Sequence, residues 1–213
     1  MKIRLTQALV VCAILAWSDV VPAADSMNSK ERLNRTPEQI IQALSKHYGH
    51  RYAGSYLQAL ALMVRADNEG VDAVRPILSK ALEKPQKMKS GSHLSGQLAF
   101  CELARTYPPA RDRVLTAANL GLKNGRPASE MPFHNQMSDA VFMACPILCE
   151  AGRLTENSMY DEVAWNHLQR IRTFCLRKDG LYRHSPLDEA AWGRGNGFPA
   201  LGLSMVLETM PAA

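Results

Sequence analysis

Apolar residues recur every three or four positions along most of this chain, which is the spacing of one face of an α-helix. The clearest start signal is Thr36-Pro37-Glu38-Gln39, followed by IIQALSKHY. Thr36 can cap a helix, Pro37 suits its first position, and Gln39 can complete a capping box. The same periodicity predicts further helices over about 55–66, 71–82, 92–107, 108–122, 138–150, 158–175 and 199–208.

The segments between the predicted helices are polar and marked by glycine and proline. The stretch KNGRPASEMPFHNQ, residues 123–136, is too long for a bare turn, and RKDGLYRHSPLDE, residues 177–189, predicts a loop with at most one short strand. Strands do not alternate with helices, and no repeat of fixed period is visible. The pattern therefore predicts an all-α fold of paired antiparallel helices, arranged as a toroid or solenoid.

Residues 1–24 have the composition of a secretory signal peptide. Lys2 and Arg4 precede the apolar run ALVVCAILAW, and the small residues of VPAA follow it. The run is too short to span a bilayer comfortably, so we expect cleavage after Ala23 or Ala24. The protein would then be periplasmic or secreted, without membrane attachment, and residues 25–213 would form its helical domain. A retained N-terminal anchor is the alternative.

The overall composition is that of an ordinary soluble globular protein, with 213 residues, 46% of them hydrophobic and 21% charged. Removal of Lys2, Arg4 and Asp19 with the signal peptide lowers the formal charge from +5 to +4. This mild excess comes without a run of basic residues interleaved with aromatics, so it does not favour nucleic-acid binding. It is compatible with a small acidic substrate.

Four cysteines remain after Cys12 leaves with the signal peptide. Cys145 and Cys149 lie one helical turn apart, which suits a shared apolar face better than a disulfide within one helix. The sequence has no CxxC pair, and we expect no zinc site and no other cofactor. We interpret the four residues as buried small side chains, with a disulfide involving Cys101 or Cys175 as the alternative.

Two polar stretches carry candidate chemistry near predicted helix starts. In HNQMSDAVFMACP, residues 134–146, Asp139 lies in the first turn of a strongly apolar helix. Taken alone, Asp139 or Ser138 is better explained as a helix cap than as a catalytic group. In GLYRHSPLDE, His184 and Asp188 flank a turn, and a single loop histidine is more often exposed to solvent than functional.

The third stretch is AWGRGNGF, residues 191–198, which predicts a glycine-rich entry into the last helix. Its three glycines would let the backbone approach a ligand closely. Free N–H groups at a helix start favour an anion, and Arg194 adds a positive charge. In the purely structural interpretation, Trp192 and Phe198 belong to the core and Arg194 to the surface.

Together the three stretches resemble the unsaturated rhamnogalacturonyl and glucuronyl hydrolases, glycoside hydrolase families 105 and 88. WGRGNGF is similar to the Trp-x-Arg-Gly-Asn-Gly-Trp signature of these enzymes, and LYRH matches their Leu-Tyr-x-His element. Their Asp-x-x-(Phe/Tyr)-Met-x-x-Pro helix start is matched by Asp139, Phe142, Met143 and Pro146. The resemblance covers about residues 130–212.

The resemblance implies an (α/α)6 barrel whose inner helices point their N-termini into a shared pocket. The substrates would be acidic oligosaccharides left by polysaccharide lyases, ending in a 4,5-unsaturated uronic acid that is removed by hydration of its vinyl ether double bond. Asp139 matches the general acid/base of the family. The substrate-binding residues would be Gln136, His184, Asp188, Trp192, Arg194, Asn196 and Phe198.

The sequence departs from the family in three respects. Phe198 stands where the signature usually has tryptophan. The second active-site aspartate of the family has no counterpart in SHLSGQLAFCELA, which offers only His93, Ser95 and Gln97 at candidate positions, and neither Asp67 nor Asp72 can be aligned with it. The chain also supplies roughly eight of the twelve helices of a closed barrel.

We therefore expect an incomplete toroid whose open apolar edge could favour self-association. The alternative function is a catalytically degenerate or truncated helical module that binds acidic sugar or a partner subunit.

Overall fold

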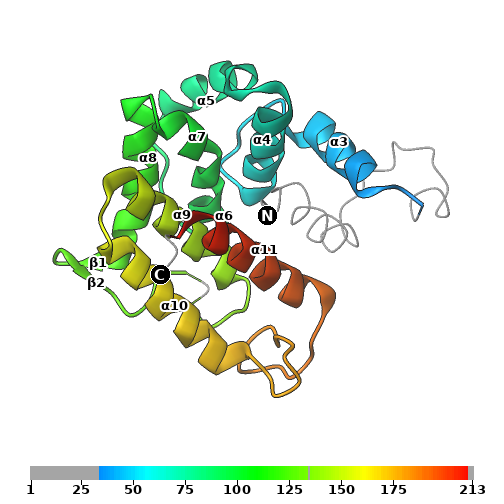
Figure 1. Cartoon of the computed structure of the whole chain (residues 1–213), viewed down its shortest axis with the longest axis vertical. Helices are drawn as coiled ribbons and strands as arrows, with labels where there is room; N and C mark the ends of the chain where they lie inside the picture. Colours follow the sequence, from blue (N-terminus) through cyan, green and yellow to red (C-terminus); the bar gives the residue numbers. More distant parts are fainter. Residues whose placement is uncertain (1–33, 134, 211–213) are drawn as a thin grey trace.

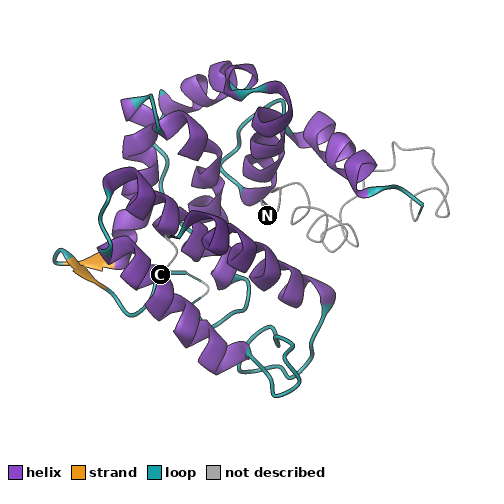
Figure 2. Cartoon of the chain, viewed as in Figure 1, coloured by secondary structure: helices purple, strands orange, loops and turns teal. Residues whose placement is uncertain are grey.

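A computed structural model of the chain describes residues 34–133 and 135–210. The regular secondary structure of this part is helical apart from one short two-stranded hairpin at its edge (Figure 2). The prediction of an all-α, toroid-type fold is therefore confirmed for the described residues. The predicted signal peptide, residues 1–24, lies outside them.

The helices follow one another along the chain, with short connections in the first half and longer ones before α9 and between α10 and α11 (Figure 1). The α-helices are α3 (Pro37–Tyr48), α4 (Tyr56–Glu69), α5 (Arg75–Leu82), α6 (Gly91–Gly96), α7 (Cys101–Ala104), α8 (Pro108–Ala118), α9 (Ala140–Thr155), α10 (Met159–Cys175) and α11 (Gly193–Thr209). Three 3-10 turns are η1 (Val71–Ala73), η2 (Gln97–Phe100) and η3 (Asn119–Gly121). The hairpin pairs β1 (Leu122–Lys123) with β2 (Arg126–Pro127).

Local sequence signals fix several of these boundaries. Thr36 and Gln39 form the predicted capping box, in which each side chain bonds the backbone of the other residue. The helix predicted over 71–82 is divided into η1 and α5, and Pro76 lies in the first turn of α5, where its missing N–H breaks no helical bond.

The helix predicted over 92–107 is also divided, into α6, η2 and α7. Its break follows Gly96, which packs against the backbone at the start of α4. A Cβ at Gly96 would lie only 2.5 Å from the carbonyl oxygen of Gly54. The helix is therefore interrupted at this backbone contact although the apolar periodicity continues through it.

The last helix begins earlier than the sequence predicts. We expected the glycine-rich stretch to lead into a helix at about residue 199, whereas α11 already begins at Gly193. The motif therefore forms the first two turns of the helix. Glycine is a poor helix former, but small residues here allow close contact with α9 and with Trp192, and packing outweighs propensity.

Helix α9 packs against both α10 and α11. It meets α11 most closely at Gly202, where an added Cβ would lie 2.6 Å from the backbone nitrogen of Phe142. The rings of Phe142 and Phe198 stack with centroids 5.4 Å apart, and Tyr56 packs edge-on against both. Because these three residues belong to the first turns of α9, α11 and α4, the N-terminal ends of these helices lie at one end of the molecule.

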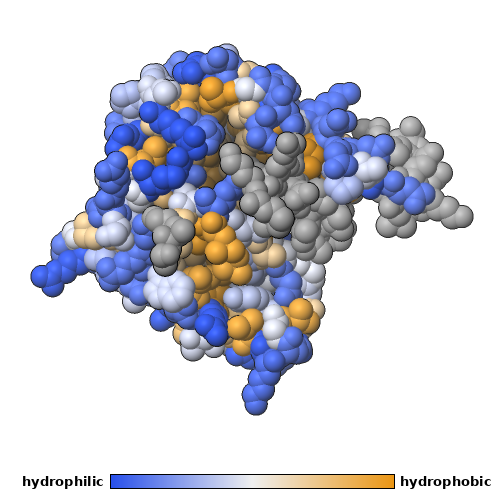
Figure 3. Space-filling view, in the orientation of Figure 1, coloured by the Kyte–Doolittle hydropathy of each residue, from blue (hydrophilic) through white to orange (hydrophobic). Residues whose placement is uncertain are grey.

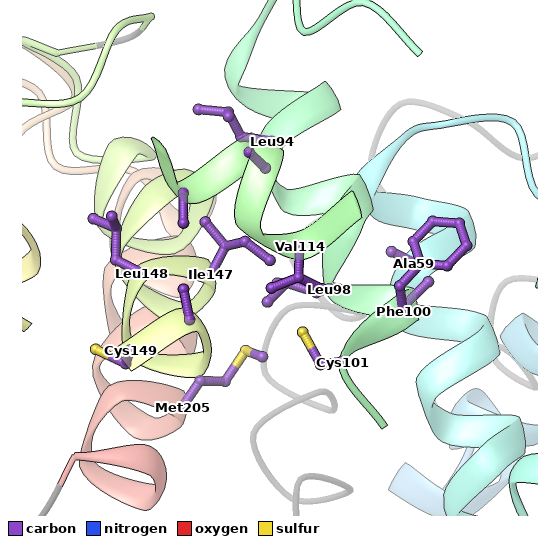
Figure 4. Close-up of a cluster of buried hydrophobic side chains, with 14 of the residues drawn as sticks. Ala59, Leu94, Leu98, Phe100, Cys101, Val114, Ile147, Leu148, Cys149 and Met205 are labelled. Carbon is purple, nitrogen blue, oxygen red and sulfur yellow. The ribbon is translucent and has the colours of Figure 1, made fainter. Parts of the chain in front are cut away.

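The main core lies between these helices and the segments η2 to α8 (Figure 4). Its labelled members in that view include Leu94, Leu98, Val114, Ile147 and Met205. Cys101, Cys145, Cys149 and Cys175 are all buried free thiols, so the interpretation as small buried side chains is confirmed and no disulfide joins them.

One face of the molecule shows apolar atoms gathered over α11 (Figure 3). Leu207 on this helix is 79% exposed, which is unusual for a large aliphatic side chain. Within residues 34–133 and 135–210, no helix has the length and apolar character that crossing a membrane requires.

His167 on α10 holds the connection that leads into α9. Its side chain is fully buried, and its Nδ1 accepts a hydrogen bond of 3.1 Å from the backbone N–H of Met131. That bond requires an unprotonated Nδ1. Burial lowers the pKa of His167 to about 4, and the charge of Arg170 acts in the same direction. The imidazole is therefore neutral at neutral pH.

We expect the stability of the protein to fall as the pH drops from 6.5 to about 4, because the unfolded chain then binds a proton at His167 that the folded chain excludes. This contribution is complete above pH 6.5 and would be reduced by about 2–3 kcal/mol near pH 4.5. Urea denaturation at both pH values measures it. In His167→Gln the difference should shrink, and an equal loss in parent and variant would contradict the assignment.

We also expect Gly202→Ala to destabilise the protein by about 1–3 kcal/mol, although alanine is the better helix former. The new methyl group would meet the backbone of α9, which cannot move aside as a flexible side chain can. Thermal or urea denaturation measures the change. Ala200→Gly, on the exposed side of the same helix, calibrates the effect of propensity alone. A Gly202→Ala variant more stable than the parent would refute the close backbone contact.

Candidate active site

The three sequence motifs come together at the N-terminal end of α9 and α11. The backbone N–H of Ser138 donates a hydrogen bond of 2.8 Å to the carbonyl oxygen of His184. The His184 ring packs edge-on against Trp192, with centroids 5.5 Å apart. A Cβ at Gly195 would lie 3.0 Å from Trp192 Nε1 and 3.5 Å from Ser138 Oγ. Each motif therefore touches the other two.

Asp139 occupies the N-cap position of α9 and is only 8% exposed. Its side chain makes no capping hydrogen bond to the described first turn of the helix, where the N–H groups of Ala140 and Val141 donate to the carbonyl oxygens of Met137 and Ser138. The capping interpretation favoured for Asp139 taken alone therefore does not describe its carboxyl group. The neighbouring Ser138 is fully buried, and its hydroxyl has no hydrogen-bond partner among the described residues.

A positive charge lies on an aromatic ring beside these groups. The guanidinium carbon of Arg194 lies 4.4 Å from the centroid of the Trp192 ring, within the range of a cation–π interaction. Trp192 is 37% exposed, and Arg194 is partly buried. No acceptor for Arg194 Nε is found in the described part of the chain. The interaction holds the guanidinium in place without neutralising its charge.

The helix starts add to this positive potential. Neither Asp139 at α9 nor Trp192 at α11 caps its helix through its side chain within the described residues. The first N–H groups of a helix lack partners within the helix and carry the positive end of its dipole. At α9 the N–H groups of Ala140 and Val141 already donate to the carbonyl oxygens of Met137 and Ser138. The groups of this region that suit an anion are therefore Arg194 and the N–H groups at the start of α11.

The other predicted substrate-binding residues are distributed differently. Gln136 is exposed, and Asp188 is exposed in a tight turn where its carboxylate accepts from the N–H of Ala190 at 2.9 Å. Phe198 is 4% exposed and belongs to the core. Asn196 bonds the backbone of the 181–184 stretch. The structure thus groups His184, Trp192 and Arg194, and the binding roles of all seven residues stay predictions.

Cys175 belongs to this region although sequence reasoning gave it no role there. Its sulfur lies 3.6 Å from the carbonyl oxygen of Gln136 and 3.8 Å from that of His184. Burial raises the pKa of the Cys175 thiol to about 11, and the carboxylate of Asp139 acts in the same direction. The thiol therefore stays protonated and donates toward these two loops. A lone cysteine at a helix end gives no sequence signal for this contact.

The alternatives for a second carboxylate lie elsewhere. Asp67 follows Tyr56 by eleven residues on α4, which places it about 16 Å along the helix from the end that carries the candidate site. Asp72 lies further still, in η1. Ser95, at the position expected for an inner helix, is buried with its hydroxyl 3.2 Å from the sulfur of Met143.

Asp67 instead lines a cavity of about 910 Å³ at the opposite ends of these helices. The charged residues around it are Asp67, Glu102, Arg105, Glu150, Arg153 and Glu208. Both arginines are paired with glutamates of the same lining, Arg105 with Glu102 and Arg153 with Glu150. The remaining charge is negative, as is the helix dipole at C-terminal ends, so this cavity does not suit an anionic substrate.

Within the described ranges, no three histidine, cysteine, aspartate or glutamate side chains are grouped as a metal ion would require.

The fold and the site define a toroid-type helical protein with a buried carboxyl group at the end of the molecule that carries Arg194 and the start of α11. The family model described as Glycosyl Hydrolase Family 88 matches residues 105–213, about half of the chain and all three motifs. The chain belongs to Glycosyl Hydrolase Family 88 and is related to glycosidases that act on carbohydrate. No curated protein and no solved structure matches it.

Proposed function

We propose that this protein removes a 4,5-unsaturated uronic acid from the oligosaccharides that polysaccharide lyases produce. The observation that carries the proposal is the buried, non-capping carboxyl group of Asp139, which lies beside the cluster of His184, Trp192 and Arg194. Family membership supports the broader class of glycosidase. The positive potential of the helix starts supports an acidic sugar.

In this proposal the uronate carboxylate binds near Arg194 and the free N–H groups at the start of α11. A guanidinium recognises a carboxylate through charge-assisted hydrogen bonds, which are stronger than neutral ones. The exposed part of the Trp192 ring provides an apolar surface for the sugar, and His184 provides a donor or acceptor for a hydroxyl group. These contacts would hold the unsaturated ring against Asp139.

Protonated Asp139 transfers its proton to C4 of the double bond, and positive charge develops at C5, stabilised by the ring oxygen. A water molecule adds to C5 and gives a proton to the Asp139 carboxylate, which restores the acid. The product is a hemiketal that opens and releases the remaining sugar. One water is consumed, and the carboxyl group ends in its starting state.

We further propose that the protein is exported, which the signal-like composition of residues 1–24 supports. Such a protein would meet lyase products in the periplasm or outside the cell. The apolar atoms over α11, including Leu207, support self-association through this face. Analytical ultracentrifugation of the parent and of Leu207→Gln tests that association, and a parent that is monomeric throughout would refute it.

A second function, binding of acidic sugar without turnover, is favoured by one observation. The described helix segments α4 and α6 bring no aspartate to the end of the molecule that carries Asp139. The two functions differ in turnover, so the same assay separates them.

We expect the parent to abolish the ultraviolet absorbance of a 4,5-unsaturated uronyl disaccharide, and Asp139→Asn to slow this by at least about 100-fold, because an amide cannot transfer the proton. Asp67→Asn, in the remote cavity, is the matched control and should keep the parent rate. Thermal denaturation of Asp139→Asn shows whether the variant keeps the fold.

A fully active Asp139→Asn would disprove the catalytic role of this residue. Binding of the disaccharide by calorimetry without any loss of absorbance would instead establish the binding module.

We expect Arg194→Gln to weaken substrate binding by about 10–100-fold, the loss that corresponds to one charge-assisted hydrogen bond. The effect should be seen mainly in KM or Kd, because the proton transfer is carried out elsewhere. Arg75→Gln, which removes an exposed cation paired with Asp72, is the control for net charge. Equal effects of the two substitutions would show that only the overall charge matters.

A further inference from the structure

The side-chain amide of Asn196 forms three hydrogen bonds with backbone groups. Its Nδ2 donates to the carbonyl oxygens of Tyr182 at 2.9 Å and Trp192 at 3.1 Å. Its Oδ1 accepts from the N–H of Tyr182 at 2.8 Å. Both amide donors are therefore used, and one lone pair of the oxygen is left for any other partner.

We infer that Asn196 is a positioning residue: its amide takes the place of a neighbouring strand and fixes the Tyr182–His184 segment and Trp192 against the start of α11. The consequence for catalysis rests on the proposed function, whereas the structural consequence does not. Within the described residues, the hydrogen bonds of the Asn196 amide go to Tyr182 and Trp192, so Asn196 acts through the residues that it holds.

The geometry of the segment supports this role. On one edge, Leu181 accepts a hydrogen bond from Arg177 N–H and Arg183 donates to Cys175, both at 2.9 Å, and Tyr182 forms a β-bridge with Leu176. Along an extended segment, successive residues present their backbone groups to alternate edges. The N–H and C=O of Tyr182 therefore point to the other edge, where the Asn196 amide meets both.

Two predicted binding residues depend on this connection. His184 lies two residues beyond Tyr182, and its ring contacts Trp192, whose own carbonyl oxygen is bonded by Asn196. The His184 carbonyl oxygen also accepts from Ser138, the residue before Asp139. A displacement of the Tyr182 segment would therefore move the imidazole, the indole ring and the entry to α9 together.

The same contacts explain why asparagine lies between two glycines in the first turns of a helix. Asparagine and glycine are both poor helix formers, so Gly-Asn-Gly weakens α11 locally. An alanine would favour the helix but would supply none of the three hydrogen bonds. The sequence thus keeps the amide at the expense of helix propensity.

The test compares Asn196→Asp with Asn119→Asp. At Asn119 the amide oxygen accepts a hydrogen bond of 2.7 Å from the Tyr160 hydroxyl, and a carboxylate can do the same. At Asn196 a carboxylate would face two carbonyl oxygens to which it cannot donate. Asn196→Ala is the second variant, which removes the bonds without adding repulsion and keeps α11 helical.

The first readout is tryptic cleavage after Arg183, which is independent of turnover. We expect cleavage to be about tenfold faster in both Asn196 variants, which corresponds to the loss of about one net hydrogen bond. Cleavage should be unchanged in Asn119→Asp. The second is the NMR shift of the His184 ring protons caused by the Trp192 ring. This shift should decrease in the Asn196 variants alone.

Cleavage and His184 shifts equal to the parent in both Asn196 variants would overturn the inference, and an accompanying loss of activity would identify Asn196 as a direct substrate ligand. Slower cleavage in Asn196→Ala would also overturn it, since only helix propensity would then matter. Faster cleavage with reduced kcat/KM supports the inference. Faster cleavage in variants of a parent that shows no turnover supports the positioning role and refutes the proposed function.

Discussion

The contact between α9 and α11 at Gly202 is the constraint on which the position of the site depends. A helix axis can approach another this closely only where a residue has no side chain, and Gly202 meets the backbone of Phe142 directly. The stacked rings of Phe142 and Phe198 then set the two helix starts side by side. Asp139 precedes one start and Trp192 the other, so the packing of the two helices brings the catalytic and binding candidates to one end of the molecule.

Sequence reasoning recovered the elements that depend on neighbouring residues. The capping box at Thr36, the helical periodicity and the order of the three motifs are local features, and the structure has the corresponding helices and brings the motifs together. Sequence reasoning failed where contacts with distant segments set the boundary of a helix. The break at Gly96 occurs where the backbone of Gly54 packs against it, and the start of α11 lies against Ser138 and Tyr182. No local pattern records these distant neighbours.

The same limit applies within the site. A resemblance between motifs pointed to Asp139, His184 and Arg194, which the fold places at one end of the molecule. It could not show that Phe198 turns into the core, or that Cys175 joins two loops, because both follow from packing around α10 and α9. Judged from the neighbouring residues alone, Asp139 was better explained as a helix cap than as a catalytic group. That explanation was wrong, because its side chain makes no capping hydrogen bond to the described helix.

The start of α9 shows how stability and chemistry are traded at a single position. An aspartate at an N-cap ordinarily stabilises its helix by about 1 kcal/mol through a bond to a free N–H group. Asp139 has the right residue type at the right place and does not make that bond within the described helix. The backbone of Asp139 is helical, and the N–H groups of Ala140 and Val141 already donate to Met137 and Ser138. The protein therefore forgoes the usual stabilisation by a cap, and a search for more stable variants would select against the arrangement at this position. Selection for thermostability and selection for activity are expected to diverge here before they diverge elsewhere in the fold.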